Sequence, residues 1–414
     1  MLCTYRHTRR SCHFGYLTQG IVNNLAPLLF TVFQDQYAVS FGQLSQLIVL
    51  NFGTQVCMDF FSVWCVDRIG IRRCALAAHL LAATGLIGMG VLPQVMAPFP
   101  GLCIAMVCSA MGSGLIEDLV SPILDGLPVG EAAPPGGKAA SMALLHSFCC
   151  WGQVAVVLGT TLALYVFGSA HWFLLPLFWA LVPLMNLFYL AKVPLPPPLP
   201  PEQKTPIHTM LRSRLFWLCL VLMLCAGAAE LTMSQWSSLF AERSLGMEKV
   251  WGDLFGPCLF AALQGMGRML YGIYGKRFDL RRALLLSASM CTACYLVTAL
   301  THTPLLALLS CAMCGLSVSL MWPGLYSLSA RAFPRGGTSM FGMMAVCGDI
   351  GCTLGPWLVG TLAGLSGDGM QGGLLAGAAF PLLMAGGLLC IVRRSVRRYA
   401  KRTTVKIDKS DEIS

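Results

Sequence analysis

Long apolar runs follow one another along most of this chain, and they restrict its fold more than any other feature. The hydrocarbon core of a bilayer is about 30 Å thick and takes roughly 20 helical residues to cross. The runs are rich in Leu, Ala, Gly and Met and lack the two-residue alternation of membrane-barrel strands, so they predict helices. We count twelve runs of sufficient length, at approximately 15–38, 41–66, 73–93, 99–127, 138–166, 171–193, 213–241, 251–275, 283–301, 303–332, 338–366 and 370–394.

The composition supports a membrane protein. The chain has 414 residues, of which 56% are hydrophobic and 11% are charged. Water-soluble domains carry about twice that share of charged residues. Because only helices and closed barrels satisfy all their backbone groups in lipid, we expect an all-α integral membrane protein whose first partner is the lipid bilayer.

Basic residues are distributed unequally among the segments that connect these runs. Short cytoplasmic loops of membrane proteins are enriched in Lys and Arg. The amino-terminal segment, every second loop and the carboxy-terminal tail hold 25 of the 28 Lys and Arg residues, whereas Arg243 and Lys249 lie in loops of the opposite side. We therefore expect a multi-pass protein of the plasma membrane with both termini in the cytoplasm. The net charge of +10 then reflects the inner membrane surface, and no nucleic-acid partner is expected.

A proline-rich segment separates the first six runs from the last six. Repeated prolines favour an extended spacer over a packed element. The predicted organisation is an amino-terminal six-helix bundle over 1–193, a cytoplasmic linker over 194–212, a carboxy-terminal six-helix bundle over 213–396 and a basic tail over 397–414.

The two sets of runs resemble each other. "VDRIGIRR" (66–73) follows the second run and "GKRFDLRR" (275–282) follows the eighth. "GLIEDLVSP" (114–122) and "GLSVSLMWP" (315–323) share a Gly and a Pro eight residues apart. Repeated halves are typical of secondary transporters that alternate access about a central site.

The first of these segments resembles the signature of the major facilitator superfamily. That signature places an acidic residue, a Gly and basic residues in the loop between the second and third helices. Val63 stands where the signature begins with Gly. The matching residues are Asp67, Arg68, Gly70, Arg72 and Arg73.

The copy in the second half matches the signature less well. Gly272 supplies the leading Gly, but Lys276 replaces the acid and Asp279 replaces the later Gly. The resemblance implies a 12-transmembrane-helix fold of two pseudo-symmetric six-helix bundles. The loop charges are then candidates for a gate that biases the inward-closed against the inward-open state. We expect Asp279, Arg268 and Asp59 to brace this gate as well.

A narrower resemblance is to the fucose permease and glucose-type branch of sugar:proton symporters. "GAAELTMSQW" (227–236) resembles the Glu-to-Trp spacing of the glucose-type relatives. Asn23 and Asn24 depart from the fucose permease pattern, which has Asn-Asp there. The matching segments are Glu117 with Ser121 and Pro122, His146 with Ser147 and Phe148, and "MWPGLYSL" over 321–328.

Five carboxylates lie inside predicted membrane helices: Asp59, Glu117, Asp118, Glu230 and Asp349. A charge at the bilayer centre costs ~2.5 to 3.5 kcal/mol on insertion scales, so each should face a cavity or a partner. We predict Glu117 and Glu230 as proton-coupling residues, with a salt bridge from Glu230 to Arg268 as the alternative. Asp118 points about 100° away from Glu117 and is expected to face a neighbouring helix. Asp349 is expected to gate or to pair helices.

A sugar site needs flat apolar walls together with amide, hydroxyl or imidazole groups. Polar and aromatic residues of the first, fifth, seventh and tenth runs supply both. The predicted substrate-binding residues are Gln19, Asn23, Asn24, His146, Gln153, Gln235, Trp236, Trp322 and Tyr326.

No cofactor, metal site or enzyme activity is predicted. The chain has no Gly-rich phosphate loop ending in Lys-Ser or Lys-Thr, which disfavours ATP as the driving force. The pairs "CTAC" (291–294) and "CAMC" (311–314) have metal or redox spacing, but with no His or second pair nearby in sequence we expect them to pack as small apolar residues.

Three functions fit these features. The first is a secondary active transporter, expected to be a monomer, that imports a monosaccharide or similar small polar solute with protons. The sequence leaves Na⁺ open as the coupling ion. The second is an exporter of drugs or metabolites with the same fold, and the third is a membrane sensor that does not transport.

Overall fold

The computed structural model describes residues 4–128, 137–197, 205–246, 251, 254–301, 303–365 and 369–391, which contain helices and no strand. The tail predicted at 397–414 and part of the linker predicted at 194–212 lie outside these ranges. The described part of the linker is irregular over 194–197 and then forms the short helix α8 (Ile207–Leu211).

The amino-terminal half is made of long helices with short connections. The first begins ten residues earlier than its apolar run, because the Thr4 amide donates to His7 Nδ1 (3.1 Å) and starts the helix within the charged segment. The elements are α1 (Tyr5–Leu28), α2 (Phe30–Tyr37), α3 (Phe41–Ile69), α4 (Ile71–Val95), α5 (Pro98–Asp125), α6 (Gly137–Phe167), η1 (Ser169–His171) and α7 (Leu174–Lys192).

The carboxy-terminal half repeats this plan with more interruptions. Pro257 lies in a π-helical turn, η3, and the tenth run is broken between two helices just before Pro323. The elements are α9 (Arg214–Leu245), η3 (Leu254–Cys258), α11 (Leu259–Tyr274), η4 (Gly275–Arg277), α12 (Leu280–Leu300), α13 (Pro304–Val318), α14 (Met321–Ala332), α15 (Gly337–Leu365), α16 (Gly369–Gly377) and a last helical stretch over 379–391.

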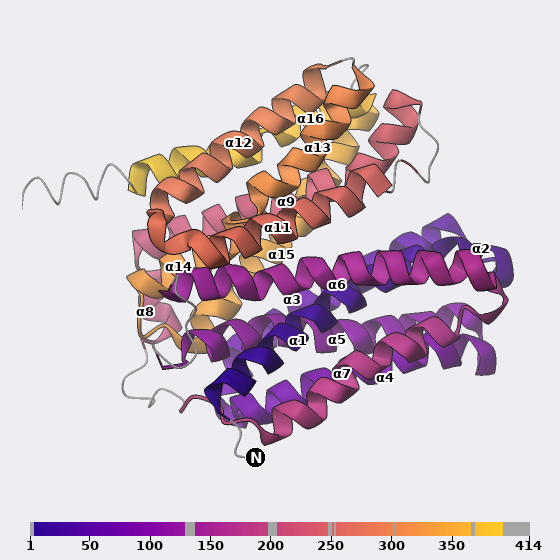
Figure 1. The fold of residues 1–414 in the computed structure, drawn as a ribbon, viewed down its shortest axis with the longest axis horizontal. Coiled ribbons are helices and arrows are strands. Elements are labelled where there is room, and N and C mark those ends of the chain that lie inside the picture. The colour runs from indigo at the N-terminus through magenta and orange to yellow at the C-terminus, as the bar shows by residue number, and fades with distance from the viewer. Residues whose placement is uncertain are drawn as a thin grey trace, which may run out of the picture.

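Ten helices of the described chain are long and apolar enough to cross a membrane. They correspond to ten of the twelve predicted runs. The described residues of the other two runs, 15–38 and 251–275, are also mainly helical and form α1 with α2 and η3 with α11. Figure 1 shows the two halves as stacked bundles, with the amino-terminal helices below and the carboxy-terminal helices above.

The two bundles contact each other mainly through two helix pairs. α6 packs against α11, and α3 packs against α15. α14 also touches α6, and α15 touches α5. These helices carry most of the predicted functional residues, so the interface between the halves contains the candidate site.

Helices within a bundle approach closely where glycine removes a side chain. A Cβ on Gly351 of α15 would overlap the backbone carbonyl of Leu224 on α9 and lie 3.0 Å from the amide nitrogen of Ala228. Membrane helices gain packing contacts in this way, because lipid provides no hydrophobic drive for their association.

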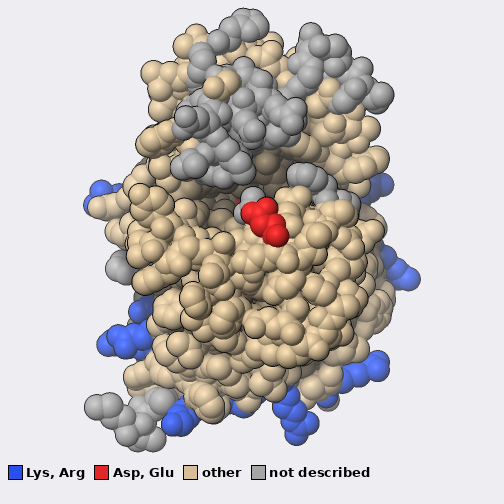
Figure 2. All heavy atoms as spheres, turned by 90° about the vertical axis from the view of Figure 1, so that its right-hand side faces the viewer, with Lys and Arg blue, Asp and Glu red and all other residues tan. Residues whose placement is uncertain are grey.

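One end of the molecule shows few charged side chains (Figure 2). Figure 2 views the end to the right of Figure 1, where uncharged side chains and one acidic group beside a hollow are in view, while Lys and Arg appear only around the outline. The amino-terminal end and α8 lie at the opposite end (Figure 1). This asymmetry agrees with the loop charges of the sequence.

Candidate functional site

Glu117 lies in the buried part of α5, with 7% of its surface exposed. Gln19 on α1 donates a hydrogen bond from Nε2 to Glu117 Oε2. The described residues offer this carboxylate no cation. A predicted substrate residue and a predicted coupling residue are therefore direct partners.

His146 on α6 links the two halves. Its Nε2 lies 3.1 Å from the hydroxyl of Tyr16 and 3.5 Å from that of Ser121, and these two hydroxyls are 2.9 Å apart. On its other side the imidazole faces the ring of Tyr326 on α14, with ring centroids 5.7 Å apart. The imidazole is 3% exposed, so this contact is part of the closed core between the bundles.

Trp322 and Tyr326 form an aromatic wall on α14. Their rings meet edge to face at 6.4 Å, and the indole lies over Gly348 of α15. Both residues are buried, and neither the indole Nε1 nor the phenol oxygen makes a hydrogen bond of standard geometry to a described residue, although the two groups lie near each other. Buried polar atoms normally have partners, so this wall has capacity to bond a solute.

Arg268 on α11 forms the salt bridge that was the alternative for Glu230. Its Nη2 donates to both carboxylate oxygens at 3.1 Å. The same guanidinium donates to the carbonyls of Ser319 (3.0 Å) and His146 (3.2 Å) and to Cys150 Sγ (3.1 Å). The prediction that Arg268 braces the loop network is wrong in its position, because the side chain is buried at the contact of α6 and α11.

Asn23 extends the polar layer toward α3 and α5. Its amide exchanges hydrogen bonds with Gln55 on α3 at 3.4 and 3.3 Å. Ser113 on α5 donates to Asn23 Oδ1 at 3.0 Å. Asn23 is only half-buried, so part of its amide is accessible.

Four predicted substrate residues lie outside this connected layer. Asn24 donates to a carbonyl of its own helix at 2.9 Å, and Trp236 donates to a carbonyl of α15 at 3.0 Å. Gln153 is half-buried where α6 meets α1, and Gln235 is exposed on α9.

Three further carboxylates surround the layer. Asp118 is 1% exposed, and neither of its oxygens has a hydrogen-bond partner in the described structure. Asp59 on α3, also 1% exposed, lies within hydrogen-bonding reach of Asp349 on α15. Asp59 therefore does not brace the loop gate as predicted, and Asp349 pairs two helices across the halves.

The predicted gate residues gather at the basic end of the molecule. Asp67 accepts a hydrogen bond from Thr338 of the other half at 2.7 Å. Arg72 donates to carbonyls at the end of α7, at 2.8 to 3.2 Å. Arg68 and Arg73 are exposed.

Two further gate residues act on helix ends. Gly70 is the only residue between α3 and α4 and has φ +101°, a conformation that suits glycine. Asp279 caps α12 by accepting hydrogen bonds from the amides of Arg281 (3.1 Å) and Arg282 (3.0 Å).

The two Cys-x-x-Cys pairs are neighbours in space, which the sequence spacing did not predict. Cys291 Sγ on α12 lies 3.7 Å from Cys314 Sγ on α13. The described residues nevertheless contain no group of three or more side chains placed to hold a metal ion.

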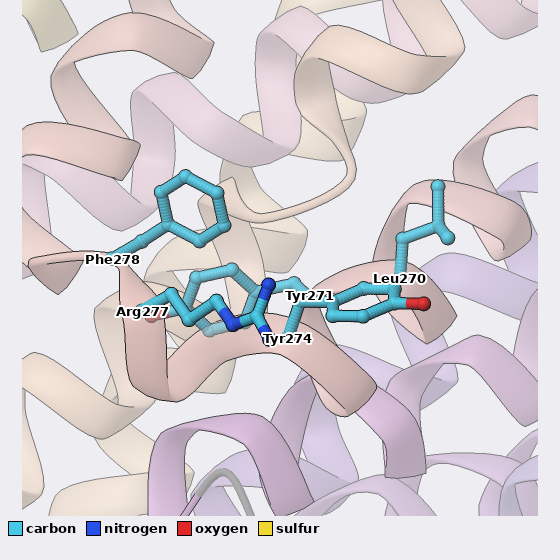
Figure 3. Close-up of a pocket in the computed structure, with 5 residues that line it drawn as sticks. All are labelled: Leu270, Tyr271, Tyr274, Arg277 and Phe278. Carbon is cyan, nitrogen blue, oxygen red and sulfur yellow. The ribbon is translucent and has the colours of Figure 1, made fainter.

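A pocket on α11 and η4 lies apart from the buried layer. Figure 3 shows its five lining residues, with the guanidinium of Arg277 beside the ring of Tyr274. The two groups are 5.8 Å apart. None of the predicted substrate or coupling residues lines this pocket.

Some members of the layer were absent from the sequence prediction. Tyr16 could have been found, because Tyr16, Gln19 and Asn23 follow one face of a helix. Gln55 and Cys150 could not, because their roles depend on helix docking: Gln55 of α3 meets Asn23 of α1 within the amino-terminal half, and Cys150 of α6 meets Arg268 of α11 across the halves.

Three comparisons place the chain among known proteins. The sequence profile described as "Major Facilitator Superfamily" matches residues 12–356. No curated protein sequence matches the chain.

Solved structures share its fold at low sequence identity. FucP in the outward conformation has a TM-score of 0.77 at 15% identity, with 92% of this chain and 97% of that chain covered. The proton:xylose symporter XylE has a TM-score of 0.74 at 13% identity, with 92% of this chain and 94% of that chain covered. The human organic anion transporter MFSD10 has a TM-score of 0.68 at 14% identity, with 92% of this chain and 99% of that chain covered. The profile match extends over most of the sequence, and the chain belongs to the Major Facilitator Superfamily.

Proposed function

We propose that this chain imports a monosaccharide or a similar small polar solute together with protons, by alternating access. As a member of the superfamily it is a membrane transporter and not an enzyme. The observation that carries the proposal is one buried polar layer contributed by both halves. In that layer Glu117 and Glu230 lie among amide, imidazole and aromatic side chains.

The chemistry of the layer favours an uncharged solute rich in hydroxyl groups. Its one buried cation, Arg268, is bonded to Glu230, so an anion would meet an excess of carboxyl groups. Gln19, Asn23 and His146 offer donors and acceptors, and the aromatic wall offers a flat apolar surface. FucP, which is described as the E. coli fucose:proton symporter, and XylE support the same class of solute.

We assign proton coupling first to Glu117. Its observed partner is the neutral amide of Gln19, so an ionised Glu117 is a buried charge without a counter-ion in the described structure. Protonation removes that charge. Glu230 is the second coupling residue, and it acts through Arg268, which connects it to the backbone of His146 in the other half.

We also propose twelve membrane crossings with both termini in the cytoplasm. α1 with α2 would form the first crossing and η3 with α11 the eighth, giving bundles over 1–193 and 213–396. The basic loops of the sequence support this orientation, as does the scarcity of Lys and Arg on the end that Figure 2 views. The expected setting is the plasma membrane, and the expected form is a monomer.

The proposal is tested by counterflow in proteoliposomes with a panel of monosaccharides at two pH values. We expect one or more sugars to exchange, and wild-type protein to accumulate sugar when a proton gradient is imposed. Glu117→Gln should still exchange sugar but lose accumulation. Asp125→Asn is the matched control, because Asp125 lies on the same helix with an exposed partner, Lys138 at 3.6 Å.

The alternatives give different results in the same assay. A sensor would bind sugar without exchanging it, and an exporter would show proton-dependent efflux of other compounds. If Na⁺ is the coupling ion, a sodium gradient will drive accumulation at constant pH. Full accumulation by Glu117→Gln would remove Glu117 from the mechanism.

A further inference from the structure

Helices α3 and α15 form a seam that joins the two halves at the basic end of the molecule. At its outer end Asp67 accepts a hydrogen bond from Thr338 at 2.7 Å. One turn inward, the Val63 carbonyl accepts from Ser339 at 3.3 Å, and the Val63 side chain covers Gly342. The contacts continue in order because the two helices run in opposite directions.

Asp59 occupies the next turn of α3, four residues before Val63. Its partner across the seam is Asp349 of α15, within hydrogen-bonding reach. Both side chains are buried, with 1% and 6% of their surfaces exposed. The innermost contact of the seam is therefore a pair of carboxyl groups, one from each half.

Asp59 lacks a hydrogen-bond donor among the described residues. Neither oxygen of Asp59 receives a hydrogen bond from any N–H or O–H group of the described chain. A buried acceptor without a donor is costly, and a carboxylate without a counter-ion is more so. A proton on one carboxyl would supply the donor and remove one charge.

The described surroundings offer the pair no free cation, and the hydroxyl of Ser62 lies beside Asp118. Glu117 and Asp118 face the pair from α5, and both are acids. On α15 itself the thiol of Cys352 lies near Asp349. On the α9 side, Glu230 is bonded to Arg268. The buried guanidinium of Arg268 is thus already paired with another carboxylate.

We propose that Asp59 and Asp349 bind one shared proton across the seam, and that this proton holds the seam closed. Two adjacent buried carboxyl groups do not both ionise, because the like charges repel and neither is solvated. When the halves move apart at this end, each carboxyl gains water and the shared proton is released. Closing the seam takes up a proton, and opening it releases one.

A metal ion fits the site between Asp59 and Asp349 less well than a proton does. The described residues contain no cluster of three or more side chains positioned to hold a metal. A monovalent cation such as Na⁺ has the right charge but would need further oxygen ligands. The test below therefore includes Na⁺ as an arm.

This inference rests on the proposed function only in assuming that the halves alternate, and it is independent of the solute. The experiment is hydrogen–deuterium exchange of the full chain in lipid nanodiscs, without sugar and without a gradient. The peptides to follow cover 59–69 and 337–349. Their exchange is corrected for the intrinsic effect of pH on amides, so that it reports seam opening.

In wild-type protein we expect opening to increase with pH, with a limiting slope of about tenfold per pH unit for one linked proton. Asp59→Asn and Asp349→Asn should each remain protected at high pH and lose the slope. In either variant the new amide donates permanently to the remaining carboxyl. Asp118→Asn is the matched control, because it removes a buried acid that is not paired across the seam, and it should retain the slope.

Several results would overturn the proposal. These are a wild-type seam whose opening does not depend on pH, an unchanged slope in both single variants, a slope lost in Asp118→Asn, and closure of the seam by Na⁺ at fixed high pH. Protection of peptides from α4 and α5 checks that each variant is folded, and the wild-type pH and Na⁺ series decides the matter even if both variants misfold. Failure of sugar counterflow alongside an intact slope would reject the proposed solute but leave the shared proton standing.

Discussion

Arg268 holds Glu230 through two hydrogen bonds of 3.1 Å and reaches across to the other half, where it donates to the carbonyl of His146 at 3.2 Å. One guanidinium therefore neutralises a carboxylate of its own half and bonds the backbone of the facing half. Any event that changes the charge of Glu230 alters how firmly Arg268 is held. The bond to α6 responds in turn.

Breaking this pair should be costly. We expect Arg268→Leu to reduce the free energy of unfolding by about 3 kcal/mol, at the lower end for a buried pair because Glu230 is partly exposed. The double variant with Glu230→Leu should recover part of the loss, since no carboxylate is then left without its cation. Thermal unfolding in detergent measures both, and a double variant less stable than Arg268→Leu contradicts the argument.

Replacing His146 should weaken substrate binding. His146→Phe keeps a ring against Tyr326 but removes the nitrogen that bonds Tyr16, so we expect roughly a tenfold loss of affinity in a binding titration, equivalent to one or two hydrogen bonds. His79 provides the matched control. It is also buried, but it bonds Asn186 within the amino-terminal half (2.7 Å). His79→Phe should lower stability and leave the affinity of the folded fraction unchanged, and equal affinity losses in both variants would argue against a role for His146.

Removing the outermost bond of the seam should favour its opening. Thr338→Val deletes the hydroxyl that donates to Asp67, which we expect to raise seam opening about fivefold, the equivalent of about 1 kcal/mol. Thr361→Val is the control, because that hydroxyl bonds only a carbonyl of its own helix. Exchange of the 59–69 peptide measures the effect, and identical exchange in the two variants would show that the bond does not hold the seam.

The close contact of α9 and α15 should reject any larger residue. Gly351→Ala places a methyl group against the Leu224 carbonyl, and overpacking of this kind costs about 1 to 3 kcal/mol. Gly386→Ala meets no atom within 4 Å and should be neutral or slightly stabilising. The difference between their thermal midpoints tests the contact, and a stable Gly351→Ala would mean that the helices separate easily.

The sequence was sufficient to predict the helical architecture. Long apolar runs report directly on helices in lipid, so the all-α membrane fold follows from composition and length alone. Ten of the twelve runs contain a spanning candidate in the described structure, and the runs over 15–38 and 251–275 do not. The breaks at Leu29, at η3 and before Pro323 are local and leave little trace in hydropathy.

The candidate site was only partly predictable. Periodicity along one helix places Gln19 and Asn23 together, and the resemblance to sugar symporters pointed to His146. Contacts between the halves depend on helix docking, which no local pattern encodes. The sequence therefore predicts Asp59 in the loop gate, whereas the structure places it opposite Asp349.

The junction between α3 and α4 has one further consequence. Gly70 is the only residue between the two helices, so the ends of α3 and α4 stay close together whatever the tilt of either helix. We expect a tilt of α3 at the seam to move the start of α4, where Arg72 is bonded to a carbonyl at the end of α7. The signature loop thus connects three helices, α3, α4 and α7, through one glycine and one arginine.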